Sequence, residues 1–125
     1  FWVRGDTGDI GSMISAEDSR KAVEKLVVKN KADAIICSTD YWAAQIMSIL
    51  QSQGYDVPGD ISIMGLGNLN LGLFTSPRLT TFDYQIEVIG QKSVDLVLDR
   101  ISQPDGDCQC KSLIVEPRIV ERESV

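Results

Sequence analysis

Two glycines separated by one residue follow a short β-branched run, and this spacing raises the first question of chemistry. Gly65-Leu66-Gly67 comes directly after Ile61 to Met64, as a phosphate-binding loop follows a strand in dinucleotide-binding proteins. That motif needs a third glycine where a helix begins, and Asn70 occupies the position. The following segment, 73–77, contains a proline and is typical of a loop. A dinucleotide site is therefore disfavoured, and a ligand-contacting loop and a plain turn stay open.

The side chains that perform nucleophilic or metal chemistry are sparse. The chain has no histidine, which excludes Ser-His-Asp and Cys-His catalysis. Cys37 lies in an apolar run and is interpreted as a small buried residue. Cys108 and Cys110 form a lone C-x-C in a polar loop, where ordinary loop residues are favoured over a metal site that would need further ligands. We therefore expect no enzyme activity, no metal and no cofactor.

Composition restricts the partners of the protein. The chain has 125 residues, 43% of them apolar, with a net charge of −6 and a pI of about 4.5. Such an acidic surface repels DNA and anionic membranes. No apolar run approaches the ~20 residues that span a bilayer, no signal peptide is visible, and the odd cysteine count favours a reducing, cytoplasmic setting. The chain opens at Phe1 without Met, as if a longer polypeptide had been cut within a strand.

Strand and helix patterns alternate along the chain. Ser15 and Asp18 predict a capping box for a helix that extends to about Asn30, and Thr39 or Asp40 caps a second helix that Gly54 ends. Apolar spacing predicts a third helix over 85–101 and extended segments at 1–4, 34–38, 61–64, 79–83 and 113–121. This order is typical of an α/β fold with a parallel sheet.

In such folds, ligands bind beyond the carboxyl ends of the strands. The candidate ligand-contacting segments are therefore the loop after Arg4, the residues 38–40, the residues 65–68, and the pair Asp83-Tyr84.

Several motifs at fixed spacing resemble one family of proteins. In chain order they are AIICSTD at 34–40, VPGDISIMG at 57–65, PRLTT at 77–81, Gly90, and EPRIVERES at 116–124. Together they resemble the C-terminal part of the effector-binding domain of LacI/GalR transcriptional regulators. The resemblance implies a periplasmic-binding-protein-like type I fold, an α/β three-layer sandwich with a parallel sheet. In this family a small-molecule effector, often a sugar, occupies a cleft between two subdomains and controls DNA binding by a helix-turn-helix.

The resemblance also implies how the chain is divided. Residues 1–84 would belong to the C-terminal subdomain, 85–112 to a crossover helix and loop that pack on an N-terminal subdomain absent from this chain, and 113–125 to a returning terminal strand. DNA would be bound only through a headpiece that this chain lacks. The alternative of the same fold is a secreted sugar-binding protein for transport or chemotaxis.

Site residues follow from the resemblance position by position. The family's Asn-Asp pair is Thr39-Asp40 here, Gly67 stands where a ligand-holding carboxylate is usual, and Asn68 comes next. Tyr84 follows the third crossover, and Ile10 occupies the place of an aromatic platform. A cleft built from these residues is less polar than usual, so we expect an atypical sugar or weak binding. Thr39 is equally well explained as a helix N-cap.

Oligomerisation is the last expectation. The resemblance implies a side-by-side homodimer through the second helix and the glycine loop, with these interface candidates: Tyr41, Ala44, Ser48, Leu71 and Phe74. The helix over 85–101 also carries an apolar stripe that includes Ile86, Ile89, Val94, Val97 and Leu98. Without a packing partner such a stripe favours self-association of this chain.

Overall fold

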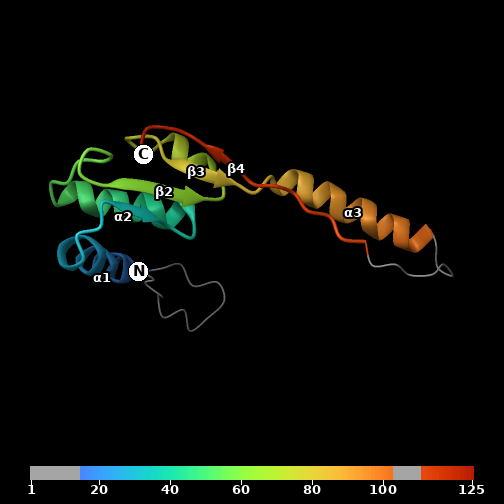
Figure 1. The fold of residues 1–125 in the computed structure, drawn as a ribbon, viewed down its shortest axis with the longest axis horizontal. Helices are drawn as coiled ribbons and strands as arrows, with labels where there is room; N and C mark the ends of the chain where they lie inside the picture. The colour runs from blue at the N-terminus through green and yellow to red at the C-terminus, as the bar shows by residue number, and fades with distance from the viewer. Residues whose placement is uncertain (1–14, 103–110) are drawn as a thin grey trace.

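The computed structural model describes residues 15–102 and 111–125 of the chain. Its elements are α1 (Ala16–Val23), the π-helix η1 (Glu24–Lys29), β1 (Ala34–Ile36), α2 (Asp40–Ser52), β2 (Ser62–Leu66), the 3-10 helix η2 (Asn70–Leu73), β3 (Thr80–Asp83), α3 (Ile86–Ser102) and β4 (Arg118–Val120). Figure 1 shows a body of sheet and helices from which α3 extends. The predicted strand at 1–4, Ile10, Cys108 and Cys110 lie outside the described residues.

Both predicted helix caps are present. The Ser15 hydroxyl oxygen accepts a hydrogen bond from the Asp18 amide at 3.1 Å, and the Thr39 hydroxyl oxygen accepts one from the Trp42 amide at 3.2 Å. These bonds satisfy amides that a helix leaves unpaired in its first turn. Gly54 follows α2 with φ +89°, the left-handed conformation expected at a helix end. The predicted first helix continues as a π-helix in its second half, which the periodicity did not indicate.

The strands are ordered β1-β2-β3-β4 in one sheet. β1, β2 and β3 are parallel, with Ile35 opposite Ile63 and Gly65 opposite Thr81. β4 is antiparallel to β3 and only three residues long, so most of the predicted extended segment at 113–121 lies outside the sheet. Pro117, which lacks an amide donor, immediately precedes β4. The α/β fold with a mostly parallel sheet is confirmed.

The core lies between the sheet and α2, and α1 packs on α2 in turn. Its largest fully buried apolar side chains come from both helices and from the strands or the residues just before them: Val23, Ile46, Leu50, Ile61, Ile63 and Leu79. The opposite face of the sheet is open among the described residues, where Ile36 is 69% exposed. Two layers of the predicted sandwich are therefore present in the described part of the chain.

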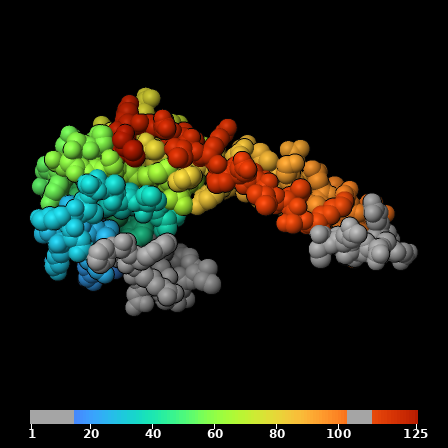
Figure 2. Space-filling view, viewed as in Figure 1, coloured from blue at the N-terminus to red at the C-terminus, as the bar shows by residue number. Residues whose placement is uncertain are grey.

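The helix α3 and the returning segment 111–117 form an arm that extends from one end of the body (Figures 1 and 2). Lys111 and Asp99 form an ion pair at 2.7 Å, and the Gln85 side chain donates to the Glu116 carbonyl at 2.6 Å, so the two segments run antiparallel. No residue of α3 is buried. Across the described residues, no helix has both the length and the apolar character required to cross a membrane.

Candidate functional site

A hollow of about 310 Å³ lies at the carboxyl ends of the parallel strands, where the arm leaves the body. Its walls come from the loop after β2, the end of β3, the first turn of α3 and the start of β4. The lining residues are Gly67, Asn68, Asp83, Gln85, Ile86, Glu87, Val88 and Arg118. Carboxylate, amide and guanidinium groups thus meet aliphatic side chains, the combination that binds small polar molecules in proteins.

Asp40 fixes the loop that borders the hollow. Its side chain is fully buried, and its two carboxylate oxygens accept hydrogen bonds from the Thr81 hydroxyl and the Leu69 amide, each at 2.6 Å. A buried carboxylate is stable only when its oxygens are satisfied in this way. These contacts support an indirect role for Asp40, which holds the loop after β2 in place. The predicted contact between Asp40 and the ligand stays a prediction.

Gly65 lies within β2, one residue further than the predicted strand, and Gly67 directly follows β2; each position requires glycine for a different reason. A methyl group at Gly65 would overlap the Asp40 carboxylate and approach the Asp40 backbone at 3.1 Å, so Gly65 allows β2 and α2 to come together. Gly67 has φ +123°, which side-chain-bearing residues rarely adopt. The loop then enters the four-residue 3-10 helix η2 and not an α-helix, so the geometry of a dinucleotide site is missing.

Asn68 is anchored from two sides. It has φ +50°, a left-handed conformation that asparagine tolerates better than most residues. Its amide donates to the Thr81 hydroxyl oxygen at 3.2 Å, and its side-chain oxygen accepts from Arg122 Nη2 at 2.7 Å. Asn68 is therefore held in one orientation at the rim of the hollow.

Asp83 and Arg118 form an ion pair on the wall of the hollow. Arg118 Nε and Nη2 donate to Asp83 Oδ2 at 3.1 and 3.0 Å, and the Gln85 amide donates to Asp83 Oδ1 at 2.7 Å. The Gln85 amide, followed by Arg118, lowers the pKa of Asp83 below its ordinary value. The ionised pair joins the end of β3 to the start of β4, at the base of the arm.

This pair predicts an acid-sensitive contribution to stability. Because the pKa of Asp83 is lower in the folded chain, the ionised carboxylate stabilises the fold above its unfolded pKa of about 3.9 and loses this effect as pH falls through the folded value. Arg118→Ala should raise the pKa of Asp83 and reduce the free energy of unfolding at neutral pH. The difference from the unsubstituted chain should vanish in acid. Urea unfolding at a series of pH values measures it, and a constant difference would contradict the assignment.

The structure brings together part of the predicted site. Gly67 and Asn68 line the hollow, whereas Thr39, Asp40 and Tyr84 are not among its lining residues. Tyr84 directly follows Asp83 and is 40% exposed. The site residues taken from the family resemblance omitted Gln85, Arg118 and Arg122, and they also omitted Asp83, although the strand-end rule had named Asp83 as a candidate. Asp83 was recognisable from its place at a strand end, but the arginines belong to the returning strand, whose antiparallel pairing no sequence motif indicated.

Thr39 is exposed, and its cap of α2 predicts a modest effect on stability. Thr39→Ala should lower the free energy of unfolding by about 1 kcal/mol, because the Trp42 amide loses its acceptor. Thr39→Ser keeps the acceptor and should stay close to the unsubstituted chain in urea unfolding. Equal losses in the two variants would show that the cap is not what stabilises the helix.

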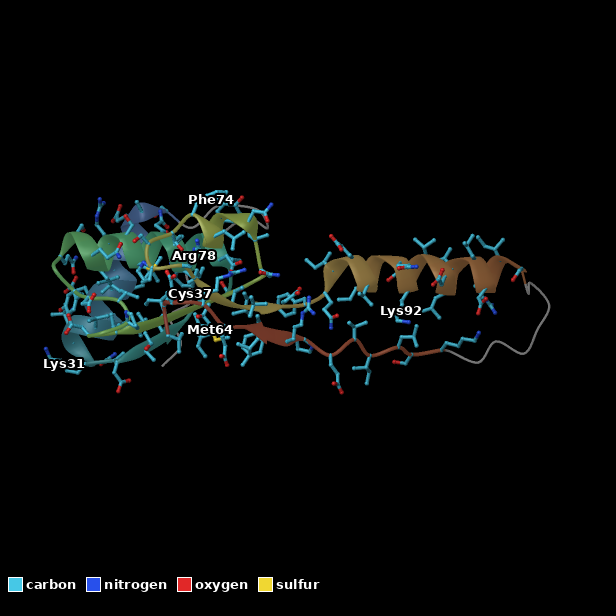
Figure 3. All side chains as sticks on the ribbon, turned by 90° about the horizontal axis from the view of Figure 1, so that it is seen from above. Lys31, Cys37, Met64, Phe74, Arg78 and Lys92 are labelled. Carbon is cyan, nitrogen blue, oxygen red and sulfur yellow. The ribbon has the colours of Figure 1, made fainter. Side chains whose placement is uncertain are left out.

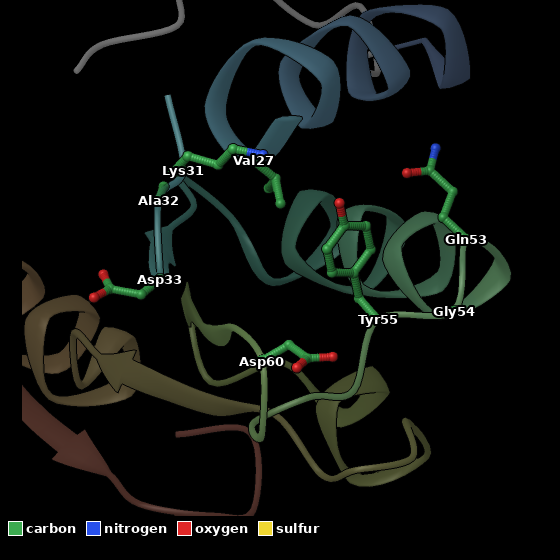
Figure 4. Close-up of a pocket in the computed structure, with 8 residues that line it drawn as sticks. All are labelled: Val27, Lys31, Ala32, Asp33, Gln53, Gly54, Tyr55 and Asp60. Carbon is green, nitrogen blue, oxygen red and sulfur yellow. The ribbon is translucent and has the colours of Figure 1, made fainter. Parts of the chain in front are cut away.

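A larger hollow, of about 480 Å³, lies at the opposite end of the sheet, between the ends of η1 and α2 (Figure 4). Tyr55, Asp60 and Val27 line it together with residues of the neighbouring turns. None of the predicted site residues lies there, and it is remote from the arm.

Cys37 is buried in the core. Its burial, followed by the nearby Asp40 carboxylate, raises the pKa of its thiol to about 12, as expected of an unreactive cysteine.

The predicted interface residues occupy two neighbouring elements, α2 and η2. Tyr41 and Ser48 are exposed on α2, Ala44 and Leu71 are half-buried, and Phe74 is 85% exposed just after η2. Figure 3 shows Phe74 at the surface of the body. The five residues thus lie on or next to two elements that contact each other, and their place in a dimer stays a prediction.

Comparison with known proteins agrees with this fold. The periplasmic binding protein-like domain family matches residues 3–125. The transcriptional repressor PurR of Vibrio campbellii is 32% identical over 124 residues, which are 99% of this chain and 35% of that protein. PurR of Aliivibrio salmonicida is 35% identical over 106 residues, 84% of this chain and 31% of that protein. The chain thus spans about a third of these curated relatives, whose repressor function agrees with the prediction that this chain is no enzyme.

Solved structures with a similar fold include regulators of the LacI family. A LacI family regulator from an Arthrobacter species, in complex with lactose, is 28% identical with a TM-score of 0.75, over 88% of this chain and 41% of that one. A LacI family regulator from Enterococcus faecium, with bound ribose, is 27% identical with a TM-score of 0.71, over 90% of this chain and 41% of that one.

Proposed function

Because this chain belongs to the LacI/GalR family of transcriptional regulators, as part of its periplasmic-binding-protein-like effector domain, we propose that it senses a small polar molecule and relays binding to DNA. The observation that carries the proposal is the position of the hollow. It lies at the base of the arm, so a ligand there would contact both the body and the two segments that lead into the arm.

The chemistry of the hollow supports a sugar-like ligand. Asp83 and Glu87 accept hydrogen bonds, Arg118 donates them, and Asn68 and Gln85 carry amides, so hydroxyl groups find partners of both kinds. Ile86 and Val88 add apolar surface for the carbon skeleton. The lactose and ribose complexes of similar regulators favour the same class. Gly67 brings no side chain, so selectivity would rest on Asn68 and on the Asp83–Arg118 pair. Contacts of Thr39, Tyr84 and Ile10 with the ligand stay predictions of the family resemblance.

The exposed apolar stripe on the arm favours contact with a second subdomain. Val94, Val97, Leu98 and Ile101 recur at helical spacing on α3 and are each more than half exposed. Helical spacing places Asp99 on a different side of α3 from this stripe. Asp99 forms the ion pair with Lys111 that holds the returning segment. The relatives are about three times as long as this chain, and we assign the stripe to contact with the remainder of such a protein, the N-terminal subdomain. Closure of the two subdomains over the hollow would then transmit ligand binding.

The exposed side chains on α2 and η2 support a homodimer. Tyr41 and Phe74 are large, exposed and aromatic, the residue type enriched in protein interfaces. Together with Ala44, Ser48 and Leu71 they would form a side-by-side contact that leaves both the hollow and the arm free. The acidic chain would reach DNA only through a separate DNA-binding segment.

Titration calorimetry on the natural protein that contains this sequence tests the proposal, with lactose, ribose and a panel of acidic and amino sugars. We expect at least one sugar to bind and Arg118→Ala to weaken its binding about tenfold or more, the value of one hydrogen bond to a charged group. Glu24→Gln, at an exposed residue of η1 that does not line the hollow, is the control and should bind as before. Binding that Arg118→Ala leaves unchanged would place the ligand elsewhere, and no binding by any sugar would refute the ligand class.

A further inference from the structure

The hollow at the base of the arm carries one negative charge more than its positive charge. Its lining includes two carboxylates, Asp83 and Glu87, and one guanidinium group, that of Arg118. Arg118 Nη2 lies 3.0 Å from Asp83 Oδ2, so these two charges compensate each other. The carboxylate of Glu87 is therefore the group whose charge the lining of the hollow leaves without compensation.

The chain also offers Glu87 no cation from outside the hollow. Across residues 15–102 and 111–125, none of the ion pairs includes Glu87. Ion pairs on a helix join residues three or four positions apart, and at these distances from Glu87 stand Asp83, Tyr84, Gly90 and Gln91, none of them basic. Glu87 lies in the first turn of α3, where the helix dipole favours a negative charge but leaves the carboxylate oxygens free to bind a ligand.

Closure of the N-terminal subdomain over the hollow, as proposed above, would remove the Glu87 carboxylate from water. A charge away from water is strongly unfavourable unless it has an opposite charge and hydrogen bonds. A hydroxyl group of a ligand would give Glu87 a hydrogen bond but no opposite charge. A protonated amine would give both, because an ammonium group is positively charged and donates hydrogen bonds.

We infer that the effector is an amino sugar with a free amine, and that Glu87 is the residue that selects it. The inference rests on the proposed function and narrows its ligand class. The ammonium group contacts Glu87 on α3, and hydroxyl groups of the same ligand contact Asn68 and Asp83 on the body. The ligand thereby connects the arm to the body through a charged contact that a neutral sugar lacks.

Titration calorimetry with matched sugars, on the natural protein that contains this sequence, tests the inference. D-glucosamine, D-galactosamine and D-mannosamine are each compared with the parent hexose and with the N-acetyl derivative, whose nitrogen is uncharged. We expect at least one amino sugar to bind about tenfold or more tightly than its parent hexose, the value of one hydrogen bond to a charged group. The N-acetyl derivative should lose this advantage. Equal affinities for the amino sugar and the hexose would overturn the inference and leave the proposed function intact.

Glu87→Gln shows whether the preference comes from this carboxylate. The variant removes the charge and keeps the size and a hydrogen-bonding group, so the affinity for the amino sugar should fall about tenfold while that for the parent hexose stays nearly the same. Asp95→Asn, at an exposed residue of α3 that does not line the hollow, is the control for the loss of a negative charge and should keep the preference. A preference that survives Glu87→Gln would assign the amine to another group and overturn the inference.

The same titrations distinguish this inference from the proposed function. If lactose, ribose or another neutral sugar binds and no amino sugar does, the inference fails alone. If no sugar of either kind binds, the proposed ligand class fails and the inference fails with it. Amino-sugar binding that Glu87→Gln weakens and Asp95→Asn leaves unchanged supports both.

Discussion

Asp40→Ala should lower the free energy of unfolding by about 3 kcal/mol, because two hydrogen bonds to a buried carboxylate are lost together. The Thr81 hydroxyl and the Leu69 amide, each 2.6 Å from Asp40, would be left without this acceptor. Since Leu69 follows Asn68, the loop that borders the hollow should lose its fixed position as well. Urea unfolding followed by circular dichroism measures the change in stability.

Asp95, exposed on α3, provides the matched control for the loss of a carboxylate. Asp95→Ala should change the free energy of unfolding by no more than about 0.5 kcal/mol, as exposed substitutions usually do. Thr81→Val removes one of the two donors to Asp40 and should fall between the control and Asp40→Ala. If Asp40→Ala costs no more than Asp95→Ala, the buried network is not what holds the loop.

Self-association of the 125-residue chain should depend on the apolar stripe of α3. Val94 and Leu98 lie one turn apart and are 57% and 58% exposed, and a stripe of this kind is expected to pair with a second copy when no other subdomain covers it. Val94→Glu with Leu98→Glu should weaken association at least about 100-fold, since burial of the two side chains is worth about 3 kcal/mol or more. Analytical ultracentrifugation over a concentration series measures this directly.

Lys92→Glu is the control for added negative charge, because helical spacing places Lys92 on the side of α3 opposite the stripe. This variant should associate much as the unsubstituted chain does. A monomer at all concentrations before any substitution would contradict the assignment of the stripe as a packing surface. Association that survives the double substitution would direct attention to α2 and Phe74 instead.

Local signals account for the parts of the fold that the sequence predicted well. The caps at Ser15 and Thr39 depend on residues three positions apart, and the helical stripe of α2 on contacts within a few turns. The parallel order of β1, β2 and β3 follows from strands that alternate with helices. The carboxyl-edge rule then placed Gly67 and Asn68 at the hollow.

The remainder of the site depends on pairing between distant segments. Arg118 meets Asp83 across 35 positions, and Arg122 meets Asn68 across 54, both because β4 returns antiparallel beside β3. No periodicity or motif within either segment specifies that register. The burial of Asp40 has the same origin, since its partners Thr81 and Leu69 come from elements that meet only in the folded chain.

The measurement that tests the central claim most directly is the affinity of the natural protein for DNA with and without a bound sugar. A duplex selected by that protein from a random pool supplies the site, and fluorescence anisotropy gives the affinity. We expect a saturating sugar to change the affinity by about 5- to 150-fold, the usual range of coupling between two sites, and Arg118→Ala to reduce the response. An affinity for DNA that stays the same while the sugar is bound, or a protein that selects no DNA at all, would contradict the claim.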